Sequence, residues 1–223
     1  SGADLRILNE VRAGEAEVTD IPNIFYHANE QNWPLWRFGP EYGEAFPDTQ
    51  FPVEFADELS KQAVPDMIFT LPDPNPNFAA TAELASQAGG AVMIGHSQTG
   101  RLPLQAALEN PSAVKGMVLI EPGGCGTADW TDEQVATFTE IPVLAVFGDH
   151  LDNDTKLPGM SWQRIFEDCQ ALVDRINEAG GDAEMLHPPE LGIAGNTHML
   201  MQDKNSLQIA DLVLEWSDDN VTE

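Results

Sequence analysis

Basic side chains are scarce in this chain. Ten lysines and arginines stand against 37 aspartates and glutamates, so the 223 residues carry a formal net charge of −27 at pH 7. A surface of this charge repels phosphate backbones and anionic lipids, so we expect neither nucleic acid nor a membrane as a partner. The acidic residues are spread along the whole chain, which distinguishes it from a disordered acidic tail.

Long apolar runs are also absent. No run of 18 apolar residues occurs, so no transmembrane helix is expected. The first residues, Ser1-Gly2-Ala3-Asp4, lack the basic and then apolar pattern of a signal peptide, and in an exported protein the signal would already be removed. A chain of this length suits one domain with a sizeable core.

Cysteine is rare, and its two copies, Cys125 and Cys169, permit one disulfide without demanding it. A buried free thiol is the alternative for Cys169, which falls on an apolar helix face. Sequons for N-glycosylation begin at Asn153 and Asn220. Together with the charge, these features favour a secreted glycoprotein, with the cytoplasm of a salt-adapted organism as the alternative. No pair of histidines has zinc-ligand spacing, so we expect no metal site.

The chain divides by composition. Residues 1–80 are rich in proline and aromatic residues, and we expect an irregular segment that packs on or over the functional site. Its only strand-like run is Ile21–Tyr26, and short helices are predicted at Asp57–Ala63 and Ala79–Gln87. Residues 81–223 are predicted to form the regular core of a single domain.

Strands and helices alternate in that core. Apolar runs predict strands, and helical spacing predicts helices. The strands are expected at Ala91–Gly95, Lys115–Ile120, Ile141–Phe147 and Ala183–Leu186, and the helices at Leu102–Leu108, Ser161–Ala179 and Ser206–Trp216. This alternation predicts a mostly parallel α/β sheet with helices on both faces.

The first strand leads into a tight turn with Ser97 at its centre. Strand, small-residue turn and helix are the context of a nucleophile elbow, which lifts a serine hydroxyl above the sheet edge. Gly95 leaves the room that such a turn needs, although Thr99 stands where glycine is usual and Gly100 follows one place later. An ordinary glycine turn is the alternative interpretation. As the residue after the serine, Gln98 would supply one oxyanion N–H.

Acidic residues and one histidine complete the pattern. Glu121 follows the second strand, Asp149 and Asp152 follow the third, and His198 precedes the last helix. The carboxyl ends of parallel strands are where active residues gather, and serine, acid, histidine is the order of α/β-hydrolases. A histidine must take the serine proton, and a carboxylate must orient that histidine. The strand ends alone do not decide between the glutamate and the two aspartates.

The chain resembles the α/β-hydrolases, and more narrowly the bacterial esterase 713-like serine esterases. The motifs that carry the resemblance are Trp36-Arg37-Phe38-Gly39-Pro40, Asp48-Thr49-Gln50-Phe51-Pro52, Gly95-His96-Ser97-Gln98 and Gly195-Asn196-Thr197-His198-Met199. This resemblance implies Ser97 as nucleophile, His198 as base and Glu121 as acid, with Asp149 or Asp152 as the alternative acid. The fold so implied has several strands before the elbow, which residues 1–96 do not provide. We therefore expect this chain to be a C-terminal portion whose sheet is completed by an N-terminal segment or a cleaved companion chain.

These features predict a serine hydrolase that cleaves small-molecule carboxylic esters or lactones through an acyl-enzyme, without metal or cofactor. Two alternatives remain: a non-catalytic binding protein on the same scaffold, and an acyltransferase with the same triad. The oligomeric state stays open, with a homodimer as one candidate.

Overall fold

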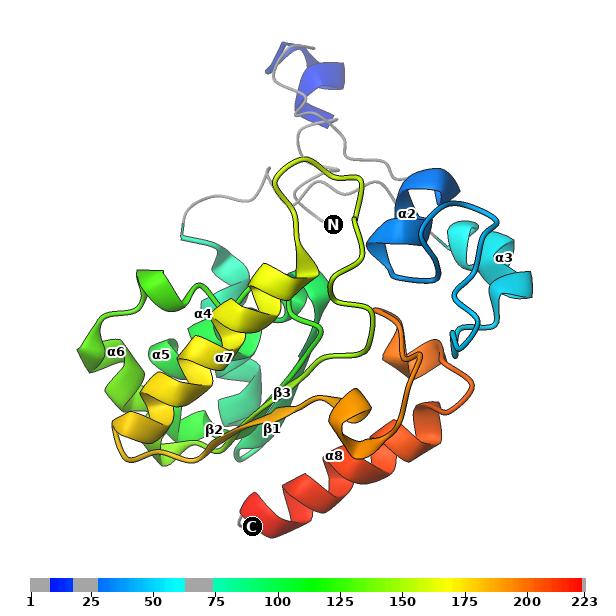
Figure 1. The fold of residues 1–223 in the computed structure, drawn as a ribbon. Coiled ribbons are helices and arrows are strands. Elements are labelled where there is room, and N and C mark those ends of the chain that lie inside the picture. Colours follow the sequence, from blue (N-terminus) through cyan, green and yellow to red (C-terminus); the bar gives the residue numbers. More distant parts are fainter. Residues whose placement is uncertain (1–8, 18–27, 63–73, 222–223) are drawn as a thin grey trace.

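A four-stranded parallel sheet forms the centre of the computed structural model, which describes residues 9–17, 28–62 and 74–221 (Figure 1). Neighbouring strands follow one another in the sequence, in the order β1-β2-β3-β4. Their bounds are Ala91–His96, Val114–Ile120, Val143–Val146 and Ala183–Leu186. The last residues of β1, β2, β3 and β4 lie side by side, because His96 pairs with Ile120, Ile120 with Val146, and Val146 with Leu186. The predicted parallel sheet is confirmed.

Helices cover both faces of this sheet, as predicted. Residues of α4, α5, α6 and α7 share one apolar core with one face of the sheet, and α8 packs on the other (Figure 1). Labelled helices are α2 (Asn29–Leu35), α3 (Ala56–Ser60), α4 (Pro76–Gln87), α5 (Leu102–Glu109), α6 (Asp132–Thr137), α7 (Trp162–Glu178) and α8 (Ser206–Asn220), and residues 9–13 are also helical.

The longest helix, α7, forms where its sequence pattern predicts it. The Ser161 hydroxyl accepts a hydrogen bond from the backbone N–H of Arg164 and caps the helix, and Gly180 follows its end with a φ of 95°. Its apolar face is buried against the sheet. The serine cap and the apolar periodicity predict the same helix, so this helix can be predicted from the sequence alone.

Other elements differ from the prediction. Helix α2 and the start of α4 lie in the segment expected to be irregular, and α6 was not predicted. Helix α3 confirms the short helix predicted at Asp57–Ala63, with shifted bounds. Helix α6 is only six residues long, and a capping box formed by Thr131 and Gln134 stabilises it more than any apolar periodicity. The predicted strand Ile21–Tyr26 lies outside the described residues.

Strand β1 lies at an edge of the sheet. Among the described residues no strand pairs with its outer side. The side chains of Val92 and Ile94 project from one face of this strand and are 37% and 65% exposed. Exposed apolar edge strands are unusual in soluble proteins, because their free N–H and C=O groups pair readily with another strand.

Candidate active site

Ser97 lies in a strained turn directly after β1. Its φ is 56°, in the left-handed region that costs a non-glycine residue free energy. A Cβ on Gly95 would lie 2.4 Å from the carbonyl oxygen of Thr99, and one on Gly100 would lie 2.4 Å from Cβ of Pro122. Glycine at 95 and 100 therefore lets the strand, the turn and the next loop approach closely. The Thr99 hydroxyl donates to the His96 carbonyl oxygen and accepts from the His96 N–H, which closes the turn and accounts for threonine here.

Glu121 lies at the corresponding place after β2, and it is fully buried with a φ of 46°. Its backbone N–H donates to the carbonyl oxygen of Val146, which extends the sheet by one more bond. Carboxylate oxygen Oε1 accepts from the N–H of Gly148 and from Nη2 of Arg37, both at 2.5 Å. The other oxygen, Oε2, is left to face His198.

His198 lies in a loop that folds around another carboxylate, that of Asp203. Asp203 accepts hydrogen bonds from the Thr197 N–H, the Thr197 hydroxyl and the Asn196 side-chain amide. Gly195 enters the loop with a φ of 80°, and a Cβ there would lie 1.9 Å from the carbonyl oxygen of Asp48. Only glycine therefore permits this loop path, which explains the Gly195-Asn196-Thr197-His198 pattern.

The three side chains form one hydrogen-bonded row. Nε2 of His198 lies 2.9 Å from Oγ of Ser97, and Nδ1 of His198 lies 3.1 Å from Oε2 of Glu121. An ionised carboxylate only accepts hydrogen bonds, so Nδ1 carries the proton and Nε2 is free to accept from the serine hydroxyl. This is the arrangement that a serine nucleophile requires.

Burial and charge set the protonation states in this row. Burial alone would raise the pKa of Glu121, but the charge of Arg37 and the hydrogen bond from His198 lower it to about 2. Burial lowers the pKa of His198 to about 4, against the opposing effect of Glu121. At neutral pH the glutamate is therefore ionised and the histidine neutral.

The remaining acidic candidates lie apart from this row. The carboxylate of Asp149 accepts from the backbone N–H groups of His150 and Gly195, and Asp152 is exposed. Asp48, Asp149 and His150 are close enough to share a metal ion. Both carboxylate oxygens of Asp149 already accept from backbone N–H groups, and Oδ1 of Asp48 accepts from His150.

Three of the other histidines have structural partners. Nε2 of His96 donates to the carbonyl oxygen of His198 at 2.9 Å, and its ring lies 4.8 Å from the His198 ring. His150 stacks on Phe46 and donates to Asp48. His187 donates to the carbonyl oxygen of Phe147, and His27 lies outside the described residues.

Two hollows flank the turn that holds Ser97. One, of about 640 Å³, lies between the glycine loop after Glu121 and the start of α7. The other, of about 600 Å³, lies between α4 and the turn, and Gln98 lines it. Arg101 borders both. Either hollow is large enough to hold part of a small molecule.

The glycine loop is fixed to α7. Cys125 and Cys169 form a disulfide. The carboxylate of Asp168 accepts hydrogen bonds from the backbone N–H groups of Cys125, Gly126 and Thr127. These bonds hold the loop that follows Glu121 and so limit how far the wall of the larger hollow can move.

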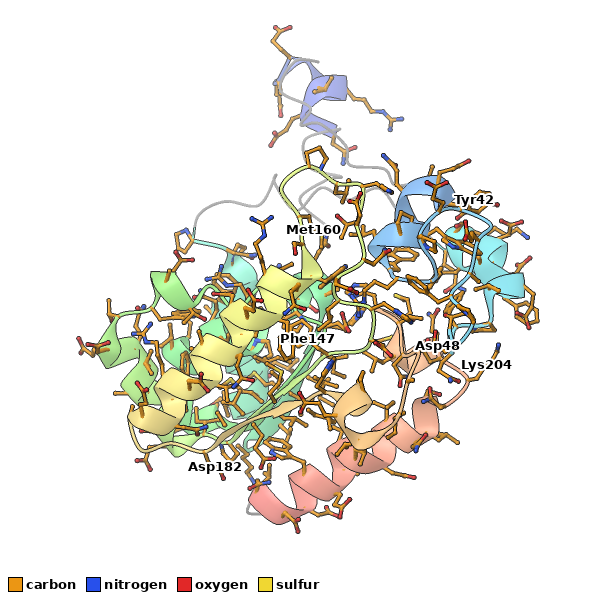
Figure 2. The ribbon with its side chains drawn as sticks, in the orientation of Figure 1. Tyr42, Asp48, Phe147, Met160, Asp182 and Lys204 are labelled. Carbon is orange, nitrogen blue, oxygen red and sulfur yellow. A yellow bond between two sulfur atoms is a disulfide. The ribbon has the colours of Figure 1, made fainter. Side chains whose placement is uncertain are left out.

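The aromatic segment before the sheet has a core of its own. Trp33, Phe38 and Phe51 are buried together, and Trp36 packs both on them and on the main core. The Trp36 carbonyl oxygen accepts from the N–H of His198 at 3.0 Å. Figure 2 shows Tyr42 at the outer end of this unit. At its other end the Lys204 N–H donates to the Gln50 carbonyl oxygen, where the unit meets the loop after His198.

Three contributors were missed by sequence reasoning. Arg37 binds Glu121, Asp203 shapes the His198 loop, and the Trp162 ring lies 4.5 Å from the His198 ring. No local sequence pattern predicts these roles. Each residue acts on a partner far away in the sequence or through the conformation of a loop. The sequons remain predictions. The Asn153 side-chain nitrogen, where a glycan would attach, donates to the Pro34 carbonyl oxygen, and Thr222 of the second sequon lies outside the described residues.

The chain is similar to two proteins that are described as an esterase and a lipase. A solved structure, described as that of a novel bacterial esterase, is 42% identical and superposes with a TM-score of 0.87, covering 97% of this chain and 65% of its own. This similarity, with the parallel four-stranded sheet and its flanking helices, is consistent with the α/β-hydrolase fold. A probable secreted lipase, phiG, from a fungus (Fungal sp., strain ATCC 74256) is 25% identical over 89% of this chain and 64% of its own. The chain thus spans about two thirds of the length of each relative. No family model matches it.

No helix in the described part of this chain combines the length and the apolar character needed to cross a bilayer.

The electrostatics of the row predict the titration of its histidine. We expect the imidazole of His198 to titrate near pH 4 in an NMR titration, because burial disfavours its charged form. Unfolded chains protonate histidine near 6.5, so folding stability should fall as the pH drops from about 6.5 to about 4. A His198 midpoint near 6.5 in the folded protein would contradict the described burial.

Proposed function

We propose that this chain carries the catalytic residues of a serine hydrolase that cleaves carboxylic esters, including lactones. The observation that carries the proposal is the hydrogen-bonded row of Ser97, His198 and Glu121 at the carboxyl edge of the sheet. Its similarity to a bacterial esterase and to a probable secreted lipase supports the same reaction class.

Acylation begins at Ser97. Its Oγ attacks the carbonyl carbon of the ester while Nε2 of His198 takes the hydroxyl proton, and Glu121 stabilises the imidazolium that forms. The backbone N–H of Gln98 donates to the oxyanion of the tetrahedral intermediate. As the intermediate collapses, His198 gives its proton to the alcohol oxygen, the ester bond breaks and the acyl group stays on Ser97.

Deacylation repeats these steps with water. His198 takes a proton from a water molecule that attacks the acyl carbon, and it returns that proton to Oγ of Ser97 as the acid leaves. For a lactone, the alcohol and the acid are two ends of one product. The mechanism uses no metal or organic cofactor.

The disulfide and the similarity to a probable secreted lipase support a location outside the cell. A buried disulfide persists in oxidising surroundings, and one relative is named as a probable secreted lipase. A secreted enzyme that acts on small esters fits both observations.

We further propose that another polypeptide segment completes the sheet along β1, as an N-terminal part of the same protein or a cleaved companion. The unpaired N–H and C=O groups along the outer side of β1 offer the pairing surface, next to the exposed apolar side chains of Val92 and Ile94. About a third of each relative's length lies outside the part that this chain covers. The added segment would also supply the second oxyanion N–H, since this fold takes one donor from a turn after an earlier strand.

Replacing the nucleophile tests the reaction. Ser97→Ala should lower kcat for a p-nitrophenyl ester at least about 10³-fold, because no hydroxyl remains to be acylated. The exposed Ser112→Ala variant is the matched control and should keep its rate. Unchanged turnover in Ser97→Ala would contradict the proposal. A wild type that binds esters without cleaving them favours the binding protein, and acyl transfer to added alcohol faster than hydrolysis favours the acyltransferase.

The mass of the protein from its natural source tests the completed sheet. After removal of any glycan, we expect either one polypeptide well above 24.3 kDa or a second polypeptide that co-purifies with this chain. An active, monomeric chain of 24.3 kDa would contradict the proposal. A native complex of two such chains would instead indicate a homodimer.

A further inference from the structure

Arg37 is a fully buried arginine beside the proposed triad. Its Nη2 donates to Oε1 of Glu121 at 2.5 Å, and its Nε donates to the carbonyl oxygen of Asp149 at 2.7 Å. The guanidinium carbon lies 4.9 Å from the centre of the Trp162 ring, which also packs against His198. Both side chains of the Arg37–Glu121 ion pair are 0% exposed.

Stability alone gives little reason for this pair. Removing two charges from water costs free energy that their attraction often fails to offset, and apolar replacements are frequently as stable. Nη1 of Arg37 has no hydrogen-bond acceptor among the described residues, which adds to the cost. An arginine retained at such a cost beside a carboxylate of the triad points to a functional role.

Backbone strain supports the same conclusion independently. In the described part of the chain, five non-glycine residues have a positive φ: Arg37, Ser97, Glu121, His150 and Lys156. Three of them are the proposed nucleophile, the proposed acid and the arginine that binds that acid. Strain of this kind persists where the surroundings enforce it and gathers at functional sites.

We propose that Arg37 is a positioning residue that holds Glu121 ionised and turned so that Oε2 faces Nδ1 of His198. The guanidinium of Arg37 connects the ends of two strands, because it binds Glu121 after β2 and the carbonyl oxygen of Asp149 after β3. The Gly148 N–H also donates to Oε1 of Glu121. Oε1 is therefore held by two donors, and Oε2 is left to accept a hydrogen bond from His198.

The charges around His198 make this role measurable. Glu121, Arg37 and His96 act on the imidazole, and Asp203 is bound within the same loop. Without Arg37, the buried carboxylate of Glu121 loses its counter-charge and its ordinary desolvation raises its pKa. The loss of the nearby positive charge also raises the pKa of His198. Without Arg37, Glu121 and His198 are therefore both expected to become protonated at a higher pH than in the wild type.

The test compares Arg37→Gln and Arg37→Lys, with Arg175→Gln as a matched control. Arg175 also binds two carbonyl oxygens and a carboxylate, but on the outer side of the α6–α7 contact. For Arg37→Gln we expect kcat to fall roughly 10- to 100-fold, the usual effect of losing a group that orients a reacting side chain. KM should change less than about threefold, and the acid limb of the kcat profile should move up by about one pH unit or more.

Arg37→Lys keeps the charge but loses the fork. Its acid limb should stay near that of the wild type, while kcat falls about fivefold or more because one ammonium cannot hold both strand ends. Arg175→Gln should leave kcat and the acid limb unchanged. A folded Arg37→Gln variant with wild-type kcat and pH profile would overturn the proposal. If Arg37→Gln does not fold, the Arg37→Lys variant tests the proposal instead. An unchanged kcat in Arg37→Lys would then overturn the proposal.

This inference rests on the proposed function, but the two can fail separately. If the wild type cleaves no ester, the proposed reaction fails. The NMR titration of His198 then tests Arg37 without turnover: the midpoint should rise in Arg37→Gln and not in Arg175→Gln. An unmoved midpoint would count against Arg37 whatever the reaction.

Discussion

The ion pair between Arg37 and Glu121 connects the parts of the molecule that form the proposed active site. Through it, the turn after α2 reaches the ends of β2 and β3, and Glu121 in turn reaches the loop that carries His198. These segments lie far apart in the sequence. Because the pair is fully buried, the charge of each partner depends on the other, so the loss of either leaves an unpaired charge in the interior.

The parallel sheet provides the platform for this network. Register brings the ends of its strands to one edge, so Ser97, Glu121 and Gly148, which closely follow β1, β2 and β3, meet there. His198 reaches the same edge on the loop between β4 and α8. Glycine at 95, 100 and 195 then allows the turns to approach within distances that a Cβ would forbid. The same edge explains where strain is stored, since Ser97 and Glu121 both leave their strands through the left-handed region.

Much of this arrangement is readable from the sequence. Apolar runs identify the four strands, and the pattern of α7 with its serine cap identifies the main helix. The order of serine, acid and histidine also follows from strand ends. The choice between Glu121 and Asp149 does not, because it depends on which carboxylate turns inward. Both carboxylate oxygens of Asp149 accept hydrogen bonds from backbone N–H groups, one in its own loop and one in a neighbouring loop. Sequence spacing does not predict these bonds.

Arg37 shows why the rest is hidden. It lies 84 residues before its partner, in a turn without periodicity, and in a chain this acidic a lone arginine is expected on the surface. Its burial depends on tertiary packing against Trp162, which itself is placed by a hydrogen bond to the Leu35 carbonyl oxygen. Helix α6 was missed for the opposite reason, because its stability is local and its apolar pattern too short to detect.

The central claim is that this buried network activates one serine. The most direct measurement is the intact mass of the protein before and after exposure to a fluorophosphonate probe, with peptide mapping of the adduct. We expect a single adduct, located on Ser97, because only a serine whose proton is taken by a neighbouring base reacts rapidly with such a probe. A folded protein that gains no adduct, or gains one on another serine, would contradict the account.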